Sequence, residues 1–139
     1  MMEKVLLDTD VILDFFFDRK PFSEDSAKIL SLSENGKIKC FVTSIMLGNI
    51  HYLLRKTATH EKIIEKLKML LQIIDVIITD KKTIEDALNS EFKDFEDALQ
   101  NFSAQNTNDV KIIITRNIKD YKTSKLSIMK PDTYLKTFQ

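Results

Sequence analysis

The sequence has few of the residues that cross-link or interrupt a fold. Its 139 residues include one cysteine, two glycines, two prolines and no tryptophan. A single cysteine excludes an internal disulfide, so we interpret Cys40, in the apolar run IKCFV, as a small core residue of a protein in a reducing compartment. The scarcity of glycine and proline excludes a low-complexity or linker-rich chain. We therefore predict one ordered domain over residues 1–139.

An excess of charge of one sign and long apolar runs are also missing. Lys plus Arg and Asp plus Glu both number 21, which excludes a global basic field, so any RNA contact must use a local patch. No apolar stretch approaches the ~18–20 residues that span a bilayer, and the start MMEKVLLDTD carries acids where a signal peptide is apolar. We expect a soluble, cytoplasmic protein with no membrane partner.

What the sequence does contain is an alternation of apolar strands with amphipathic helices. Strands are predicted at Lys4–Leu7, Ile38–Val42, Ile73–Thr79, within VKIIITRN and in LSIM. The helices between them start at the capping candidates Asp10, Ser23, Thr43 or Ser44, Asp80 and Asp94, and at Pro131. Parallel strands need such crossover connections. The predicted fold class is therefore α/β, in three α/β/α layers with a mostly parallel sheet of about five strands.

Polar side chains follow the predicted strands at one edge of this sheet. In parallel sheets the functional crevice lies beyond the carboxyl ends of the strands. The rule selects Asp8, Asp10, Thr115, Arg116 and Asn117. We expect Asp10 to cap the following helix, whereas Asp8 ends a buried strand with no capping role, where an unpaired carboxylate is costly. A functional role is therefore the better interpretation of Asp8.

A second acidic pair, Asp94 and Asp97, lies in the segment DFEDALQNFSAQ. Asp94 is also a candidate helix cap. If Asp97 meets Asp8 at the edge of the sheet, the two like charges raise each other's pKa unless a proton or cation neutralises them. Mg²⁺ or Mn²⁺ prefers such carboxylate and water oxygens and can join them to a substrate phosphate. His51 and His60 have no partner at metal-ligand spacing and are interpreted as non-ligands.

The order of four segments carries a family resemblance. The segments LLDTDVILDFF, VTSIMLGNIHYLLRK, DFEDALQNFSAQ and IIITRNIKDYKTSKLSIMKPDTYL together resemble a PIN domain across essentially the whole chain. The resemblance implies a metal-dependent endoribonuclease with Mg²⁺ or Mn²⁺ as cofactor and RNA as substrate. It also implies the toxin of a type II, VapBC-type toxin–antitoxin pair, with an antitoxin protein as partner and a homodimer as the assembly.

Carried over by position, the family acids fall on Asp8 and Asp97, and the last motif falls on Thr115 and Asn117. The candidate catalytic residues are Asp8, Asp97, Asn117 and Asn49; the candidate metal ligands are Asp8, Asp97, Asp94 and Asp120; the candidate substrate contacts are Asp10, Thr115 and Arg116. Asn49 departs from the pattern, because PIN nucleases usually carry Glu there. Its neutral amide weakens metal binding unless Asp94 or Asp120 compensates.

Three functions remain open. In the first, a metal held by Asp8 and Asp97 activates water for in-line attack on an RNA phosphate, and Arg116 clamps the phosphate oxygens. In the second, Asn49 has weakened the site and the chain is a non-enzymatic RNA- or protein-binding module. In the third, LLDTDVIL is the first motif of a haloacid dehalogenase-like phosphatase with Asp8 as nucleophile. The third lacks a downstream Gly-Asp pair for the metal.

Overall fold

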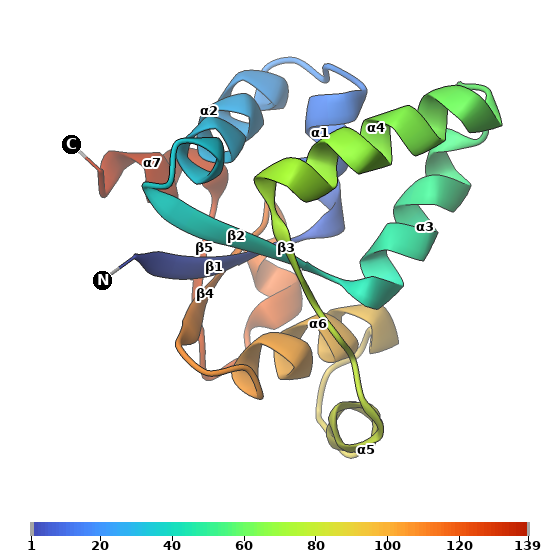
Figure 1. Ribbon diagram of the computed structural model, residues 1–139. Coiled ribbons are helices and arrows are strands. Elements are labelled where there is room, and N and C mark those ends of the chain that lie inside the picture. The colour runs from blue at the N-terminus through green and yellow to red at the C-terminus, as the bar shows by residue number, and fades with distance from the viewer. Residues whose placement is uncertain (1, 139) are drawn as a thin grey trace.

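The computed structural model, which describes residues 2–138, contains one sheet of five parallel strands (Figure 1). The strands are β1 (Glu3–Leu7), β2 (Ile38–Thr43), β3 (Asp75–Ile77), β4 (Val110–Ile114) and β5 (Ser127–Met129), in the order β3-β2-β1-β4-β5. The central position of β1 explains its continuous apolar run, since a parallel strand is covered on both faces. The predicted α/β class and strand number are confirmed, and every pairing is parallel.

Helices cover both faces of this sheet. They are α1 (Thr9–Phe16), α2 (Phe22–Glu34), α3 (Ser44–Leu54), α4 (His60–Ile73), α5 (Lys81–Leu88), α6 (Phe95–Gln105) and α7 (Pro131–Lys136), with a short 3₁₀ helix η1 (Ile118–Tyr121). In Figure 1, α1, α2, α4 and α7 lie on one side and α5 and α6 on the other, while α3 rises from the carboxyl end of β2. The predicted three layers are confirmed, and the carboxyl ends of all strands point to one edge.

Two predicted helix starts are wrong. The N-cap of α1 is Asp8, whose Oδ1 accepts a hydrogen bond from the Thr9 amide at 2.7 Å, so Asp10 lies inside the first turn. Helix α2 begins at Phe22 without a side-chain cap, and the hydroxyl of Ser23 donates instead to Asp18 at 2.8 Å. In each case the chain turns into the helix one or two residues before the position that the capping pattern favoured.

The other predicted caps and most boundaries are confirmed. The side chains of Thr43, Asp80 and Asp94 each accept a hydrogen bond from an amide three residues further on. Strand β3 is shorter than predicted at both ends: α4 continues to Ile73, and the strand ends at Ile77 instead of Thr79. The η1 turn was not predicted. Cys40 is fully buried, which raises the pKa of its thiol to about 12, and its interpretation as a core residue is confirmed.

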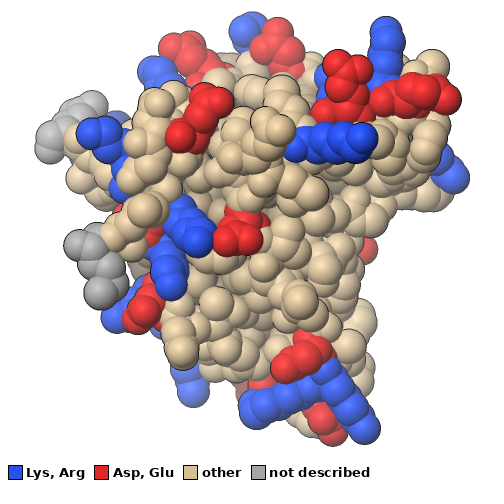
Figure 2. All heavy atoms as spheres, viewed as in Figure 1, with Lys and Arg blue, Asp and Glu red and all other residues tan. Residues whose placement is uncertain are grey.

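Charge is distributed as the composition suggests. Figure 2 shows acidic and basic side chains intermixed around one face of the molecule, with a wide uncharged area between them. Between residues 2 and 138, no helix is both long and apolar enough to cross a membrane. A cluster of charges of one sign can therefore occupy only a small part of the surface. One such cluster, of acids, lies at the carboxyl edge of the sheet.

Candidate active site

A cavity of 260 Å³ opens at the carboxyl end of β1, between α1, α3, α6 and the turn that follows β4. Of the candidates from the sequence, it brings together Asp8, Asp10, Asn49, Asp97, Asn117 and Asp120. Its lining contains five carboxylates, those of Asp8, Asp10, Glu96, Asp97 and Asp120, and one cationic side chain, that of Arg19. We call this the acidic cavity. Segments more than a hundred residues apart in the chain thus meet in one concave site.

Asp8 is the most rigidly held of these acids. Its Oδ1 accepts from the Thr9 amide and its Oδ2 accepts from the Thr115 hydroxyl, each at 2.7 Å, and the residue is only 7% exposed. Burial raises the pKa of Asp8, and the hydrogen bond from Thr115 counteracts that rise. The expectation that Asp8 has no capping role is wrong, since it begins α1. Thr115, predicted to contact substrate, is fully buried and orients Asp8 instead.

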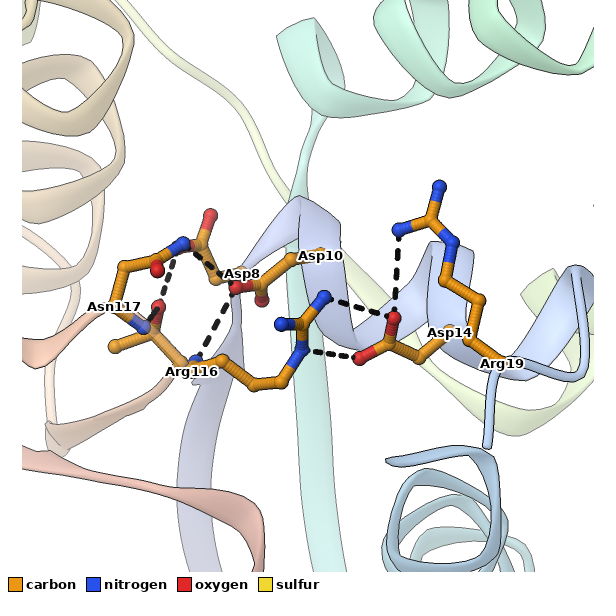
Figure 3. A network of polar contacts seen from close by, with 7 residues as sticks. Asp8, Asp10, Asp14, Arg19, Arg116 and Asn117 are labelled. Atoms are coloured by element: carbon orange, nitrogen blue, oxygen red, sulfur yellow. Dashed lines mark hydrogen bonds and ion pairs between the residues drawn. The ribbon is translucent and has the colours of Figure 1, made fainter. Parts of the chain in front are cut away.

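Asp10 lies in the first turn of α1, two residues after Asp8, against the segment that follows β4 (Figure 3). Its Oδ2 accepts hydrogen bonds from the Arg116 amide at 3.3 Å and from Nδ2 of Asn117 at 3.1 Å. Its Oδ1 is buried, with no hydrogen-bond partner among the described residues. Burial and the nearby charge of Asp8 raise the pKa of Asp10 to about 7. A buried carboxylate oxygen without a donor is costly, so this corner favours a proton or a cation.

Asp97 faces the same cavity from the first turn of α6. Burial first, and then the negative charges of Asp8 and Asp94, raise its pKa to about 7. The hydroxyl of Tyr121 lies 3.5 Å from Oδ1 of Asp97. Asp94 caps α6 by accepting from the Asp97 amide at 3.0 Å, and it lines a neighbouring cavity with Asp97 and Asp120. Of the two acids on α6 that the sequence singled out, only Asp97 lines the acidic cavity.

Asn49 has an acidic partner that was not predicted. Its Nδ2 donates to Oε2 of Glu96 at 3.2 Å, so a carboxylate stands directly beside the neutral amide. Glu96 precedes Asp97 and lies one turn before Gln100, and both Glu96 and Gln100 line the acidic cavity. Helical spacing alone places these two on one face of α6 and was a usable signal. The carboxylate that contacts Asn49 is therefore that of Glu96, while Asp120 lines the same cavity.

Tyr121 is a second residue that the sequence did not indicate. It is buried, and its hydroxyl donates to Oε1 of Gln100 at 2.6 Å. Burial and the charges of Asp8 and Asp97 raise the pKa of Tyr121, which keeps the phenol protonated as a donor. The residue lies in η1, a turn with no periodic pattern. Only the tertiary structure brings this phenol under the acids.

Arg116 is engaged elsewhere. Its Nε and Nη2 donate to the two carboxylate oxygens of Asp14 at 2.6 and 3.0 Å, and Asp14 is fully buried (Figure 3). The guanidinium also lies over the ring of Phe22, 4.0 Å from its centroid. It lines a different cavity, of 390 Å³, together with Phe22 and Pro131. Because both carboxylate oxygens of Asp14 hold it, Arg116 is not a free clamp for a substrate phosphate.

The residues fit a divalent cation through a small ligand set. Among residues 2–138, no three His, Cys, Asp or Glu side chains are grouped closely enough to hold a metal ion. Mg²⁺, however, is commonly bound through one or two carboxylates while it keeps several waters. The charge of Asp8 raises the pKa of Asp97, and Oδ1 of Asp10 has no hydrogen-bond donor among the described residues. These features match a site that a cation with few protein ligands would stabilise.

Comparisons with known proteins give a consistent result. The model of the PIN domain family matches residues 4–119. Ribonuclease VapC1 of Aquifex aeolicus is 28% identical over 103 residues, which cover 70% of this chain and 71% of that protein. A toxin–antitoxin complex from Klebsiella pneumoniae contains a similar chain, with a TM-score of 0.68, 22% identity and coverage of 91% and 97%. A chain of VapBC2 from Rickettsia felis, bound to a promoter DNA fragment, has a TM-score of 0.66 and 20% identity. The match covers 91% of this chain and 97% of that one.

Proposed function

The chain belongs to the PIN domain family, and from this premise we propose that it is a metal-dependent endoribonuclease that cleaves RNA phosphodiester bonds. We further propose that it acts in the cytoplasm as the toxin of a type II toxin–antitoxin pair, bound by an antitoxin protein and assembled as a homodimer. The relative named Ribonuclease VapC1 supports the ribonuclease, and the structural neighbours from toxin–antitoxin complexes support an antitoxin partner.

The single observation that carries the proposal is the meeting of Asp8 and Asp97 in one cavity. They come from opposite halves of the chain, and the charge of Asp8 raises the pKa of Asp97. Such an arrangement costs stability and serves no structural pairing, since no lysine lines the cavity and its one arginine is drawn toward Asp14. Acids kept close together at a cost are characteristic of catalytic sites.

Mg²⁺ or Mn²⁺ held by Asp8 and Asp97 would polarise the phosphate and make a bound water more acidic. The chain's own residues prepare that site. Thr115 fixes the orientation of Asp8 through a hydrogen bond of 2.7 Å. Tyr121 donates to Gln100 and thereby holds the Gln100 amide at the cavity wall beside Asp97. Rigid donors and acceptors of this kind hold catalytic groups without reorganisation during the reaction.

Glu96 weakens the case for a binding module without activity. Loss of a carboxylate at Asn49 was the feature that favoured that alternative. Because Glu96 accepts a hydrogen bond from Asn49 and lines the same cavity, we propose that it returns the missing negative charge. The phosphatase alternative also gains no support, because the family model that matches is that of the PIN domain and the relative from Aquifex aeolicus is named as a ribonuclease.

The test is RNA cleavage by the purified chain with Mg²⁺ or Mn²⁺. We expect wild type to cleave and Asp97→Asn to lose activity by about a hundredfold or more, since even indirect partners of a metal are worth 10–100-fold. Asp132→Asn, an exposed substitution of the same chemistry on α7, is the matched control. Expression of wild type alone should degrade RNA and arrest growth, and Asp97→Asn should not. Equal cleavage by wild type and Asp97→Asn would refute the assignment.

A further inference from the structure

We infer that Arg19 binds a phosphate group of the nucleic-acid backbone at the rim of the acidic cavity, an inference that rests on the proposed function. The sequence pointed to Arg116 for this task, but Arg116 is held by Asp14 and lines another cavity. Arg19 is the one cationic side chain in the lining of the acidic cavity. A polyanionic substrate needs such a group, because the five carboxylates repel it.

The contacts of Arg19 leave most of its hydrogen-bonding capacity free. Its Nη1 lies 3.4 Å from Oδ1 of Asp14, and the same oxygen already accepts from Nη2 of Arg116 at 3.0 Å. Figure 3 shows the two arginines reaching Asp14 from different directions. A guanidinium carries five N–H donors in a planar fork that matches two phosphate oxygens. Since only one long contact is made, and the Arg19 side chain is 43% exposed, the remaining donors are available to a ligand.

The backbone at Arg19 is fixed although its guanidinium is accessible. The Arg19 amide donates to the Asp14 carbonyl at 3.0 Å, and the Arg19 carbonyl accepts from the Ser23 amide at 2.7 Å. The guanidinium carbon also lies 5.0 Å from the centroid of the Phe17 ring. A side chain that rises from a fixed backbone and packs beside an aromatic ring loses less conformational freedom when it binds a ligand. Arg19 therefore lines the cavity on a fixed backbone and keeps donors that its long contact with Asp14 does not use.

The competing explanation is that Arg19 serves only as a second partner of Asp14. Salt dependence separates the two explanations, because each phosphate contact on single-stranded nucleic acid contributes about −0.7 to the slope of log K against log[salt]. We propose to measure binding of a fluorescent single-stranded RNA of mixed sequence by anisotropy, in EDTA to prevent metal-dependent cleavage, over a series of salt concentrations. A DNA strand of the same sequence forms the second arm, and KM for RNA cleavage is measured alongside.

Arg19→Gln should make the slope less negative by about 0.7 and weaken RNA binding roughly tenfold. The same loss is expected on DNA, because the backbone phosphate is common to both, and Arg19→Lys should keep the slope. Lys20→Gln is the matched control: it removes one positive charge at the adjacent residue, which is outside the cavity lining and paired with Asp18 at 3.3 Å. Lys20→Gln should leave the slope unchanged.

Several results overturn the inference. These are an unchanged slope for Arg19→Gln, even with a lowered melting temperature; an equal loss for Lys20→Gln; a loss on RNA but not on DNA; or no binding by wild type. Its failure is distinguishable from failure of the proposed function. If wild type cleaves RNA while Arg19→Gln keeps both KM and slope, only the role of Arg19 is wrong. If Arg19→Gln makes the slope less negative but wild type cleaves no RNA, only the proposed nuclease activity is wrong.

Discussion

Helix α1 carries two acids one turn apart, Asp10 and Asp14, whose surroundings are opposite. Asp14 is fully buried and receives two hydrogen bonds from Arg116 and a longer contact from Arg19, a group that we call the Asp14 cluster. Asp10 faces Asp8, keeps one oxygen without a donor, and has a pKa of about 7. The fold neutralises an acid that it needs only for structure. In the acidic cavity, by contrast, it leaves Asp8 and Asp10 without a cationic partner among residues 2–138, so that a bound ligand can neutralise them.

The comparison has a consequence for catalysis as well as for stability. The Asp14 cluster ties the segment after β4 to α1, and the same segment supplies the amides of Arg116 and Asn117 that lie against Asp10 and Thr115. The structural pair thus holds one wall of the acidic cavity in place. Five substitutions or conditions would test how separate the two regions are.

The largest expected effect is on the Asp14 cluster. Arg116→Met leaves the buried carboxylate of Asp14 with one long contact, and loss of one partner from a buried ion pair costs about 3 kcal/mol or more. Urea unfolding followed by circular dichroism measures this change. Arg55→Met, at the exposed end of α3, is the control and should stay within about 0.5 kcal/mol of wild type. A loss below about 1 kcal/mol for Arg116→Met would show that Arg19 can replace it.

The acidic cavity should make stability fall as pH rises. Asp10 and Asp97 have folded-state pKa values of about 7, above the ordinary 3.8, so the folded chain holds more protons than the unfolded chain between these values. Their contribution is complete below about pH 4 and is lost through about pH 7. After a reduction for solvent screening, we expect a loss of about 2 kcal/mol, or roughly 8 °C in melting temperature, between about pH 5 and about pH 8.

Added Mg²⁺ or Mn²⁺ should recover more of that stability at about pH 8 than at about pH 5, because the cation binds the ionised carboxylates. Thermal unfolding with and without EDTA measures both effects. Asp97→Asn should flatten the pH profile and reduce the response to the cation. A flat wild-type profile would mean that the acids of the cavity are already neutralised by other groups.

Substitution of Glu96 tests whether its negative charge contributes to metal binding or whether Glu96 only happens to lie next to Asn49. Glu96→Gln keeps the hydrogen-bonding shape but removes the charge, and it should weaken Mn²⁺ binding by about tenfold in calorimetry. Glu91→Gln, an exposed change outside the acidic cavity, should leave the affinity unchanged. Asn49→Glu combined with Glu96→Gln moves the carboxylate from residue 96 to residue 49. It should restore Mn²⁺ binding if the cavity needs the negative charge but not at one particular residue. Unaltered affinity in Glu96→Gln would remove Glu96 from the site.

The smallest effect on stability is expected from substitution of Thr115, which donates a hydrogen bond to Asp8. Thr115→Val keeps the volume of the side chain but removes the hydroxyl that donates to Oδ2 of Asp8. An unsatisfied buried acceptor costs about 1 kcal/mol, and the loss of a donor should raise the pKa of Asp8 further. Denaturation above neutral pH and the pH profile of RNA cleavage measure the two changes. Thr115→Ser retains the hydroxyl and should resemble wild type in both.

Much of the fold followed from local pattern. Apolar runs located β1 and β4, and capping residues such as Asp94 located the start of α6. Errors arose where two local signals competed. Asp8 and Asp10 both suit a helix cap; in the structure Asp8 caps α1, and its other oxygen accepts a hydrogen bond from Thr115, 107 residues further along the chain. Local pattern also predicted that Asp8 and Asp10 lie at one edge of the sheet, because the carboxyl ends of parallel strands meet there.

The sequence by itself determined the parallel α/β sheet and the edge at which acids gather, because both follow from periodicity and from the crossover rule. Only the tertiary structure decided which charges are paired. Arg116 joins Asp14 across 102 residues of sequence and Glu96 meets Asn49 across 47. Pairing energies depend on distance and burial, which the linear order of residues does not contain. That is why only the structure shows that Arg116 belongs to the Asp14 cluster, while Arg19 and Glu96 line the acidic cavity.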